Sequence, residues 1–535
     1  MSSPSQAARH ERRMVQFFSD PRHYPHPVET ILHRETHVSH VFLAGPFAYK
    51  LKKPVCFPFL NAATLARRKR FCHLELTLNR RLAPTMYLGM VPVVETADGL
   101  QLDGDGRIIE WVVKMQRLPE DRMLDQLIAT RRIRRREMAQ IADRLVAFFR
   151  EAPRGPRIAR YGTPAQVARL VLGNLQECRP FVGTLVSAAD YRLLEAAFRQ
   201  HLALYEPVLA RRFRQRRIID GHGDLRCENI CVTNPVQIFD CVEFQPAFRC
   251  GDVANDFSFL VMDLEFRGRG DLADLIVDRY RRGLRDATSD LVLPLYQCHR
   301  SLVRGKVRGL AWQQHPTTAE GRRIRELARR HFVLAIRYAR AFAPPRLIVV
   351  GGLIGSGKST LARQLAEHLG ASWLRTDEIR LQEFAHLRRS AQGFASGLYA
   401  PRVSELVYQR LIRRAEALVR QGRSVVCDGT FSKAIGRERL RRLAARYGAS
   451  FHFFECVVPK AVAMHRLAAR AKAHTDLSEA RPEHYERLRA GFDPVRGWPS
   501  RLWTRLSTHR SPAATTHAAL VALRRGWSVG QRPVR

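Results

Sequence analysis

One stretch of the sequence combines glycines, a lysine and a hydroxyl group at a spacing that can bind phosphate. Residues 352–359 read Gly-Leu-Ile-Gly-Ser-Gly-Lys-Ser, which fits the pattern G-x-x-x-x-G-K-[ST], and an apolar strand-like segment precedes them. In this setting backbone N–H groups wrap a phosphate, the lysine reaches the β and γ oxygens, and the serine hydroxyl binds Mg²⁺. The expected nucleotide-binding residues are Gly352, Gly355, Ser356, Gly357, Lys358, Ser359 and Thr360, and Ser359 is also an expected metal ligand.

Two aspartates follow the next expected strands of the same region. Asp377 comes after a strand-like segment that ends near Arg375, and Asp428 follows the apolar residues 425–427. Because the carboxyl ends of parallel strands face one crevice, both carboxylates are expected near the phosphates. We expect Asp377 to take a proton from an acceptor hydroxyl, with a helix N-cap as its alternative role. We expect Asp428 to hold Mg²⁺ through water.

Two arginines further along the chain are four residues apart on an expected helix. Arg466 and Arg470 therefore share one face, where they could close over the phosphates or form a solvated surface. With these motifs, and with Leu-Ser-Glu-Ala at 477–480, residues 346–500 resemble the small P-loop kinases often catalogued as AAA-type ATPases. That group is similar to gluconate kinases, zeta toxins and polynucleotide 5′-hydroxyl kinases. The resemblance implies phosphoryl transfer from ATP or GTP to a small acceptor.

A second constellation lies earlier in the chain. Residues 222–229 read His-Gly-Asp-Leu-Arg-Cys-Glu-Asn, and Asp240 follows an apolar segment after them. This spacing is typical of a protein-kinase-like catalytic loop with its metal-binding aspartate. We expect Asp224 to orient the acceptor hydroxyl and Asn229 and Asp240 to hold Mg²⁺, because phosphoryl transfer needs these oxygen groups. Arg226 in the same loop is a further candidate catalytic residue.

A kinase-like site also needs a lysine on a strand, paired with a glutamate on a helix. Strand alternation places Ala48, Lys50 and Lys52 on one face, and the order Ala48-x-Lys50 repeats that of the kinase motif. We therefore expect Lys50 rather than Lys52 to contact the nucleotide. Glu75 in the following helical stretch is its expected partner, although an ordinary surface position is the alternative for Glu75.

These motifs, without a glycine-rich loop before the lysine, resemble the aminoglycoside phosphotransferase and choline kinase branch rather than a protein kinase. Asp-Cys-Val-Glu-Phe at 240–244 is similar to that branch's Asp-Phe-Glu-Tyr with one extra residue, so the role of Glu243 stays open. The resemblance implies that Asp252 anchors the catalytic loop. Over residues 25–500 the chain resembles a bacterial family described as bifunctional aminoglycoside phosphotransferase/ATP-binding proteins, a label that names a fold rather than a substrate.

The elements that must position these residues divide at Pro344-Pro345. We expect a kinase-like domain at 1–343, a P-loop kinase domain at 346–520 and a tail at 521–535. The first should have strands at 38–44, 47–52, 87–94 and 107–115 around a helix at 62–81, then helices interrupted by a hairpin region between 219 and 240. The second should alternate strands at 347–350, 424–427 and 451–456 with helices. The expected fold class is α/β and α+β multidomain, a protein-kinase-like bilobal fold followed by a P-loop NTPase with a parallel sheet.

Composition agrees with a folded chain of more than one domain. The chain has 535 residues, of which 45% are hydrophobic and 26% charged, and no apolar run approaches the length of a membrane span. Lys plus Arg number 90 against 50 Asp plus Glu, and the excess is spread along the chain, so nucleic-acid binding is possible but not favoured. The 10 cysteines form no zinc or disulfide pattern. We expect a cytoplasmic protein without a membrane partner.

The motifs together predict an enzyme with two nucleotide sites. Each would use ATP or GTP with Mg²⁺ and transfer phosphate to a hydroxyl group of a small molecule. One alternative makes the P-loop domain a nucleic-acid 5′-hydroxyl kinase. A second alternative, a nucleotide-gated scaffold, would leave one domain without turnover.

Overall fold

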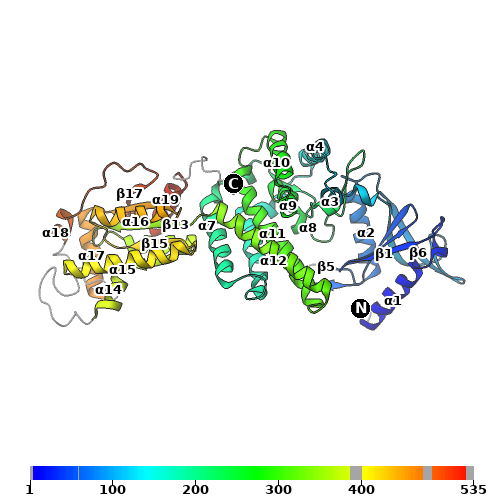
Figure 1. Cartoon of the computed structure of the whole chain (residues 1–535), viewed down its shortest axis with the longest axis horizontal. Coiled ribbons are helices and arrows are strands. Elements are labelled where there is room, and N and C mark those ends of the chain that lie inside the picture. The colour runs from blue at the N-terminus through cyan, green and yellow to red at the C-terminus, as the bar shows by residue number, and fades with distance from the viewer. Residues whose placement is uncertain (1–3, 58–59, 386–399, 474–484, 526–535) are drawn as a thin grey trace. The chain divides into compact units, whose positions relative to one another are not determined.

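The computed structural model describes residues 4–57, 60–385, 400–473 and 485–525, and its chain forms two compact units (Figure 1). The first unit joins Met1–Val167 with Ala210–Arg300, and the second joins Ala168–Leu209 with Ser301–Arg535. Residues 1–343, expected as one domain, therefore contribute to both units. The reason is that the helices at 168–209 and 301–342 make more of their contacts with each other and with the P-loop region.

A six-stranded antiparallel sheet forms the N-terminal part of the first unit. The four strands expected there are confirmed, with edges shifted by one or two residues, and β1 and β7 are added at the two sides. The strand order is β1 (Ile31–Glu35), β2 (Ser39–Ala44), β3 (Phe47–Lys52), β8 (Arg107–Gln116), β6 (Tyr87–Thr96) and β7 (Gly99–Leu102). β3 lies in the middle of this sheet, paired with β2 and β8.

Helices cover both faces of this sheet. α2 (Leu65–Asn79), the helix expected at 62–81, starts at the N-cap Thr64 and packs against β8 and β6. α1 (Pro4–Phe18) buries Met14, Phe17 and Phe18 among the apolar side chains of the opposite face. The sheet is therefore enclosed, and polar side chains that reach its faces must be paired.

The rest of the first unit is mainly helical, as expected. The hairpin region at 219–240 is confirmed as short paired strands, β10 with β11 and β9 with β12. Its elements are η2 (Glu120–Arg122), α3 (Leu124–Ala129), α4 (Arg135–Glu151), α5 (Pro156–Ala159), η3 (Arg160–Gly162), β9 (Ile218–Asp220), η5 (Cys227–Asn229), β10 (Ile230–Cys231), β11 (Gln237–Ile238), α8 (Pro246–Arg249), β12 (Cys250–Asp252), α9 (Val253–Phe266) and α10 (Gly270–Leu284), while α6 (Pro164–Glu177), α7 (Ala188–Arg214) and α11 (Ser289–Gln314) cross between the units.

A five-stranded parallel sheet forms the core of the second unit. Its order is β14 (Ser372–Arg375), β15 (Val425–Asp428), β13 (Arg346–Gly352), β16 (Ser450–Val457) and β17 (Trp503–Ser507), so the expected parallel sheet is confirmed. β13, in the centre, is buried along its whole length, as its apolar run predicts. The C-terminal edge of β13 opens into the phosphate loop.

Two apolar layers enclose the parallel sheet. α15 (Pro401–Arg420) and α16 (Ala434–Arg446) cover one face, and α13 (Lys358–Leu369) and α19 (Pro512–Arg525) cover the other. Leu523 is buried in this second layer, so the packed domain extends beyond the expected end at residue 520. The other helices of this unit are α12 (Ala319–Phe342), α14 (Thr376–Phe384), α17 (Lys460–Ala473) and α18 (Tyr485–Ala490).

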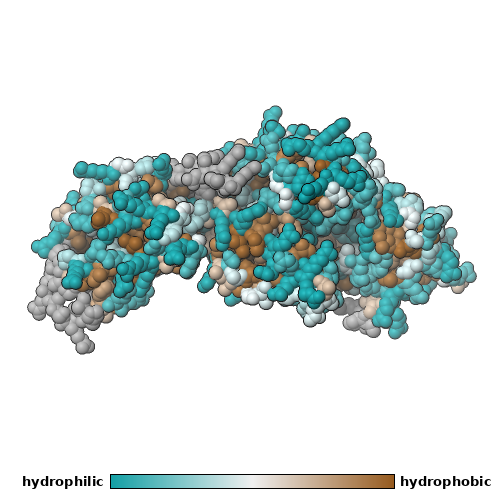
Figure 2. All heavy atoms as spheres, in the orientation of Figure 1, coloured by the Kyte–Doolittle hydropathy of each residue, from teal (hydrophilic) through white to brown (hydrophobic). Residues whose placement is uncertain are grey.

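Figure 2 shows hydrophilic side chains distributed over most of the visible face of the molecule. None of the helices in the described ranges has both the length and the apolar character that a bilayer crossing needs.

A buried arginine organises the helical part of the first unit. Arg212 is fully buried, and its guanidinium group donates to Asp252 at 2.6 and 2.7 Å and to Asp286 at 2.7 and 2.9 Å. Asp252 also caps α9 by accepting from the backbone N–H of Ala254. The two carboxylates share one buried cation, so removal of the arginine leaves both of them buried without it.

We expect Arg212→Met to lower the free energy of unfolding of this unit by about 3–5 kcal/mol, because it breaks a buried ion pair on one side. Urea unfolding followed by circular dichroism measures the loss. Arg211→Met, at the exposed neighbouring position, is the control and should change stability by no more than about 0.5 kcal/mol. Equal stability of the two variants would show that Arg212 does not hold these helices.

Candidate functional site

The first site is built around the ammonium group of Lys50 on β3. Its Nζ lies 2.7 Å from Glu75 Oε1 on α2 and 2.7 Å from Asp240 Oδ1, which follows the short strand β11. Three segments that are far apart in the sequence therefore meet at one amino group. The structure brings together the lysine, glutamate and aspartate that the sequence singled out, and Glu75 is buried rather than a surface residue.

Charge attraction rather than burial controls the ionisation of this group. Burial by itself lowers the pKa of Lys50, but the carboxylates of Asp240 and Glu75 outweigh it and hold the pKa well above its usual value. Conversely, the charge on Lys50 is the largest cause that lowers the pKa of Asp240. All three groups are therefore ionised near neutral pH, which is the state needed to bind a phosphate at the lysine and a cation at the aspartate.

The catalytic-loop candidates form a second cluster in the same unit. Asp224 receives two bonds from Arg226, with Nε at 2.8 Å and Nη2 at 2.9 Å, so the guanidinium group grips both carboxylate oxygens. Asn229 donates from Nδ2 to the backbone oxygen of Asp224 at 2.9 Å and to its Oδ2 at 3.1 Å. The loop therefore holds the Asp224 carboxylate in one orientation, with Arg226 as its direct partner.

The carboxylate that anchors this loop is Asp256, not Asp252. Asp256 accepts the backbone N–H groups of His222 and Gly223 at 2.7 Å each, whereas Asp252 pairs with Arg212. The expectation for Asp252 was wrong because that residue is the N-cap of α9 and faces the buried arginine. Asp256 lies one helical turn later and reaches the loop. The close approach of Asp256 also requires glycine at position 221, because a Cβ on Gly221 would lie 2.4 Å from Asp256 Oδ2.

The residues of this site fit a magnesium ion. Asn229 uses its amide nitrogen for Asp224, which leaves the amide oxygen as a ligand, and Asp240 supplies a carboxylate held in its ionised form. Oxygen ligands of this kind are what Mg²⁺ prefers. Asp240 also adopts φ of 64°, a conformation that non-glycine residues rarely adopt.

The second site is the phosphate loop between β13 and α13. Gly352, Gly355 and Gly357 have φ of 144°, 75° and 78°, which side-chain-bearing residues rarely adopt. A Cβ on Gly352 would lie 2.4 Å from the backbone oxygen of Cys456, and one on Gly355 would lie 2.8 Å from that of Ala463. Conformation therefore favours glycine at all three positions, and space requires it at Gly352 and Gly355. Lys358, Ser359 and Thr360 begin α13 directly after them.

Asp428 ends β15 beside the phosphate loop, as expected. Burial raises the pKa of its carboxyl, while Lys358 and a hydrogen bond from Ser359 act in the opposite direction. Its Oδ1 is buried without a hydrogen-bond partner among the described residues, and so is Ser356 Oγ. Buried polar atoms without partners fit a site for a phosphate and a hydrated cation, so Ser356 Oγ suits a phosphate oxygen and Asp428 Oδ1 suits Mg²⁺ or a water bound to it.

Asp377 lies in the first turn of α14, close enough to Asp428 to act on its pKa. The N-cap position of this helix is occupied by Arg375, so Asp377 is not the N-cap residue. Arg375 is also 3.7 Å from Asp428 Oδ2, a contact that the sequence motifs did not indicate. Strand pairing brings these groups together, because Arg375 and Asp428 are register partners at the ends of β14 and β15.

Arg466 contacts the phosphate loop from α17. It donates to the backbone oxygens of Gly355 at 3.4 Å and Thr508 at 2.8 Å, and the Thr508 hydroxyl donates to the backbone oxygen of Ser356. Arg466 and Thr508 thus both support the loop through its backbone oxygens. No sequence motif indicated the role of Thr508. The side chain of Arg470 and residues 477–480 lie outside the described residues.

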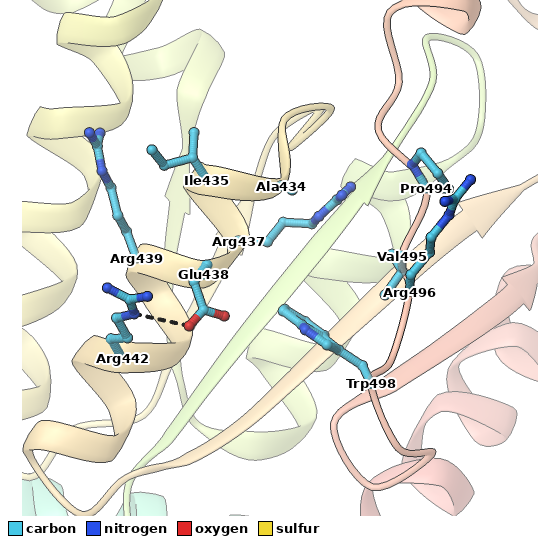
Figure 3. A pocket seen from close by; sticks show the side chains of 10 residues that line it. All are labelled: Ala434, Ile435, Arg437, Glu438, Arg439, Arg442, Pro494, Val495, Arg496 and Trp498. Atoms are coloured by element: carbon cyan, nitrogen blue, oxygen red, sulfur yellow. Dashed lines mark hydrogen bonds and ion pairs between the residues drawn. The ribbon is translucent and has the colours of Figure 1, made fainter.

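A cavity of about 550 Å³ lies elsewhere in the second unit (Figure 3). It is bounded by the start of α16 and by the segment 494–498, with Arg437 and Trp498 projecting between them. Arg437 donates to the backbone oxygens of Phe431 and Asp493, and Trp498 packs edge-on against Phe451. These side chains hold α16 and the segment 494–498 on the sheet, and none of the phosphate-loop residues lines this cavity.

Comparison with known proteins agrees with the second site. Residues 347–495 match the family described as AAA domain. With the phosphate loop in place, this match supports an enzyme of the nucleotide-dependent kinase class.

Solved kinase structures are similar to parts of the chain at low identity. A choline/ethanolamine kinase family protein from Mesorhizobium loti is 15% identical, covers 61% of this chain and 98% of its own, and has a TM-score of 0.35. A sugar kinase from Janibacter sp. is 21% identical, covers 34% of this chain and 95% of its own, and has a TM-score of 0.27.

Full-length relatives occur in mycobacteria. The uncharacterized protein Rv2004c of Mycobacterium tuberculosis is 34% identical over 446 residues, which are 83% of this chain and 87% of that protein. The uncharacterized protein Mb2027c of Mycobacterium bovis matches with the same identity and coverage. The chain described here therefore belongs to the same protein family as these mycobacterial proteins.

Proposed function

We propose that the protein is a bifunctional ATP-dependent phosphotransferase, with a kinase-like site in the first unit and a P-loop kinase site in the second. Each site transfers a phosphoryl group to a hydroxyl group of a small molecule. The observation that carries the proposal is the position of Lys50 Nζ, at 2.7 Å from both Glu75 and Asp240. A lysine held in this way between a helical glutamate and the metal-binding aspartate is the arrangement that protein-kinase-like enzymes need.

In the kinase-like site Lys50 binds the nucleotide phosphates and Glu75 holds Lys50 in place. Asn229 and Asp240 hold Mg²⁺, which neutralises charge on the phosphates. Asp224 orients the acceptor hydroxyl and accepts its proton as the hydroxyl oxygen bonds to the γ-phosphorus, while the bond between that phosphorus and the β,γ-bridging oxygen of ATP breaks and ADP leaves. Arg226 donates to both oxygens of the Asp224 carboxylate, at 2.8 and 2.9 Å, and so holds it in one orientation.

In the P-loop site the backbone of residues 352–357 and Lys358 bind the phosphates. Ser359 and Asp428 hold Mg²⁺, and their mutual hydrogen bond supports this pairing. Asp377, which is close to Asp428 at the same edge of the sheet, accepts the acceptor's proton. Arg466 adds positive charge beside the loop.

The first prediction is that one chain binds two nucleotides. Titration calorimetry with a non-hydrolysable ATP analogue and Mg²⁺ should give a stoichiometry near two for the intact chain. Lys358→Ala should reduce it to one, because the lysine supplies the main charge on the P-loop side. A stoichiometry of one in the unmodified protein would refute the kinase-like site.

The second prediction separates Asp224 from Asp240. In a Lys358→Ala background, Asp224→Asn should leave MgATP binding intact and reduce phosphoryl transfer by about 10²- to 10⁴-fold, because it removes only the proton acceptor. Asp240→Asn should also weaken MgATP binding by at least about tenfold, because it removes a metal ligand. Transfer is measured with labelled ATP against a pool of hydroxyl compounds. Full transfer by Asp224→Asn would show that the catalytic-loop assignment is wrong.

A further inference from the structure

Two buried charged residues beside the kinase-like site have no role in the mechanism above. Lys52 is 4% exposed and Glu243 is 8% exposed, and their side chains form an ion pair with each other. Charged groups are rarely buried at this level unless they are paired. The pair joins β3 to the loop that carries Asp240.

Lys52 shares Glu75 with Lys50. Strand alternation places both lysines on the same face of β3. Each forms an ion pair with a different oxygen of Glu75: Lys50 Nζ lies 2.7 Å from Oε1, and Lys52 Nζ lies 2.5 Å from Oε2. The orientation of the Glu75 carboxylate is therefore set by two lysines together. Loss of Lys52 would free one oxygen and allow the carboxylate to turn away from Lys50.

Glu243 completes the arrangement on the other side. Asp240 and Glu243 are three residues apart in the loop, and they pair with Lys50 and Lys52, which are two residues apart in the strand. The loop is thus fastened to β3 at two points, one at each end of the segment 240–243. The strained φ of 64° occurs at Asp240, the first of these two points.

We propose that Lys52 and Glu243 form a positioning pair that sets the geometry of Lys50 and Asp240 and so determines the affinity of the kinase-like site for MgATP. The inference rests on the proposed function of that site. It also gives a role to Glu243, which the 240–244 motif left open, since the Glu243 carboxylate pairs with a lysine of the strand. Neither residue contacts the nucleotide; both act through Glu75 and the loop.

The test uses the full chain in the Lys358→Ala background, so that nucleotide binding reports the kinase-like site alone. Lys52→Met and Glu243→Gln should each weaken binding of a non-hydrolysable MgATP analogue by about 10- to 100-fold in calorimetry, the usual effect of removing a residue that orients a ligand group. The double variant should be no weaker than the worse single variant, because Lys52→Met already removes the Lys52–Glu243 ion pair that Glu243→Gln removes. Lys52→Arg should restore most of the affinity.

Lys53 provides the matched control. It is the neighbouring buried lysine, but it pairs with Glu35 and Glu11 rather than with the site. Lys53→Met and Glu35→Gln should change the MgATP affinity by less than about twofold. Thermal unfolding of every variant reports stability separately, and titrations with Mg²⁺ and with EDTA separate effects on Lys50 from effects on Asp240. A structural role alone would lower the unfolding midpoint of Lys52→Met as in Lys53→Met without changing affinity.

The outcomes distinguish the pair from the site itself. If the Lys358→Ala protein binds no nucleotide, the proposed function of the first unit is wrong. If that protein binds nucleotide and Asp240→Asn weakens the binding, the outcome depends on the other two variants. The positioning pair is refuted if folded Glu243→Gln and folded Lys52→Met both bind MgATP within about twofold of the Lys358→Ala protein. Where Lys52→Met does not fold, Glu243→Gln and Glu243→Asp decide, with unchanged affinity again refuting the pair.

Discussion

An ammonium group that is largely removed from water needs carboxylates beside it, and this requirement at Lys50 joins three parts of the first unit. The cost of removing the charge from water is met only if the partners are close and well oriented. Those partners come from α2 and from the loop after β11, which lie far from β3 in the sequence. The sheet, the helix and the hairpin region must all be in place before carboxylates can balance the positive charge of the lysine. The candidate site is therefore also a point where the fold is joined.

The second unit binds phosphate by a different physical principle. Its loop relies on backbone N–H groups at a helix N-terminus, so the determining residues are glycines in conformations that other residues rarely adopt. Side chains then support that backbone: Arg466 and Thr508 contact its carbonyl groups. Much of this geometry is local in sequence, whereas the geometry around Lys50 is assembled from distant segments. The two sites consequently differ in how far a single motif can describe them.

The carboxylates beside the kinase-like site have different roles, structural or chemical, which depend on the groups that each one contacts. Asp252 neutralises the buried Arg212, and Asp256 holds the catalytic loop by two backbone N–H groups. Asp224 is instead gripped by Arg226, with its carboxylate partly open to solvent. Asp252 and Asp256 are four positions apart, about one helical turn, and this difference decides between a structural ion pair and an anchor for the loop. Residue type alone does not make this distinction.

The sequence by itself determined the features that depend on local pattern. Apolar runs and alternation located β2, β3, β6 and β8 and the central strands of the parallel sheet, and spacing located the phosphate loop and the loop at 222–229. Strand alternation and the order Ala48-x-Lys50 also chose Lys50, which does contact Glu75 and Asp240. The tertiary structure alone decided what long-range packing controls: that Asp256 rather than Asp252 anchors the loop, that Glu243 pairs with Lys52, that Arg375 and Thr508 lie beside the phosphate loop, and that helices before Pro344 pack with the second unit. The physical reason is that spacing along the chain reports which residues share a face, whereas the partner of a buried charge depends on which other segment supplies the opposite charge.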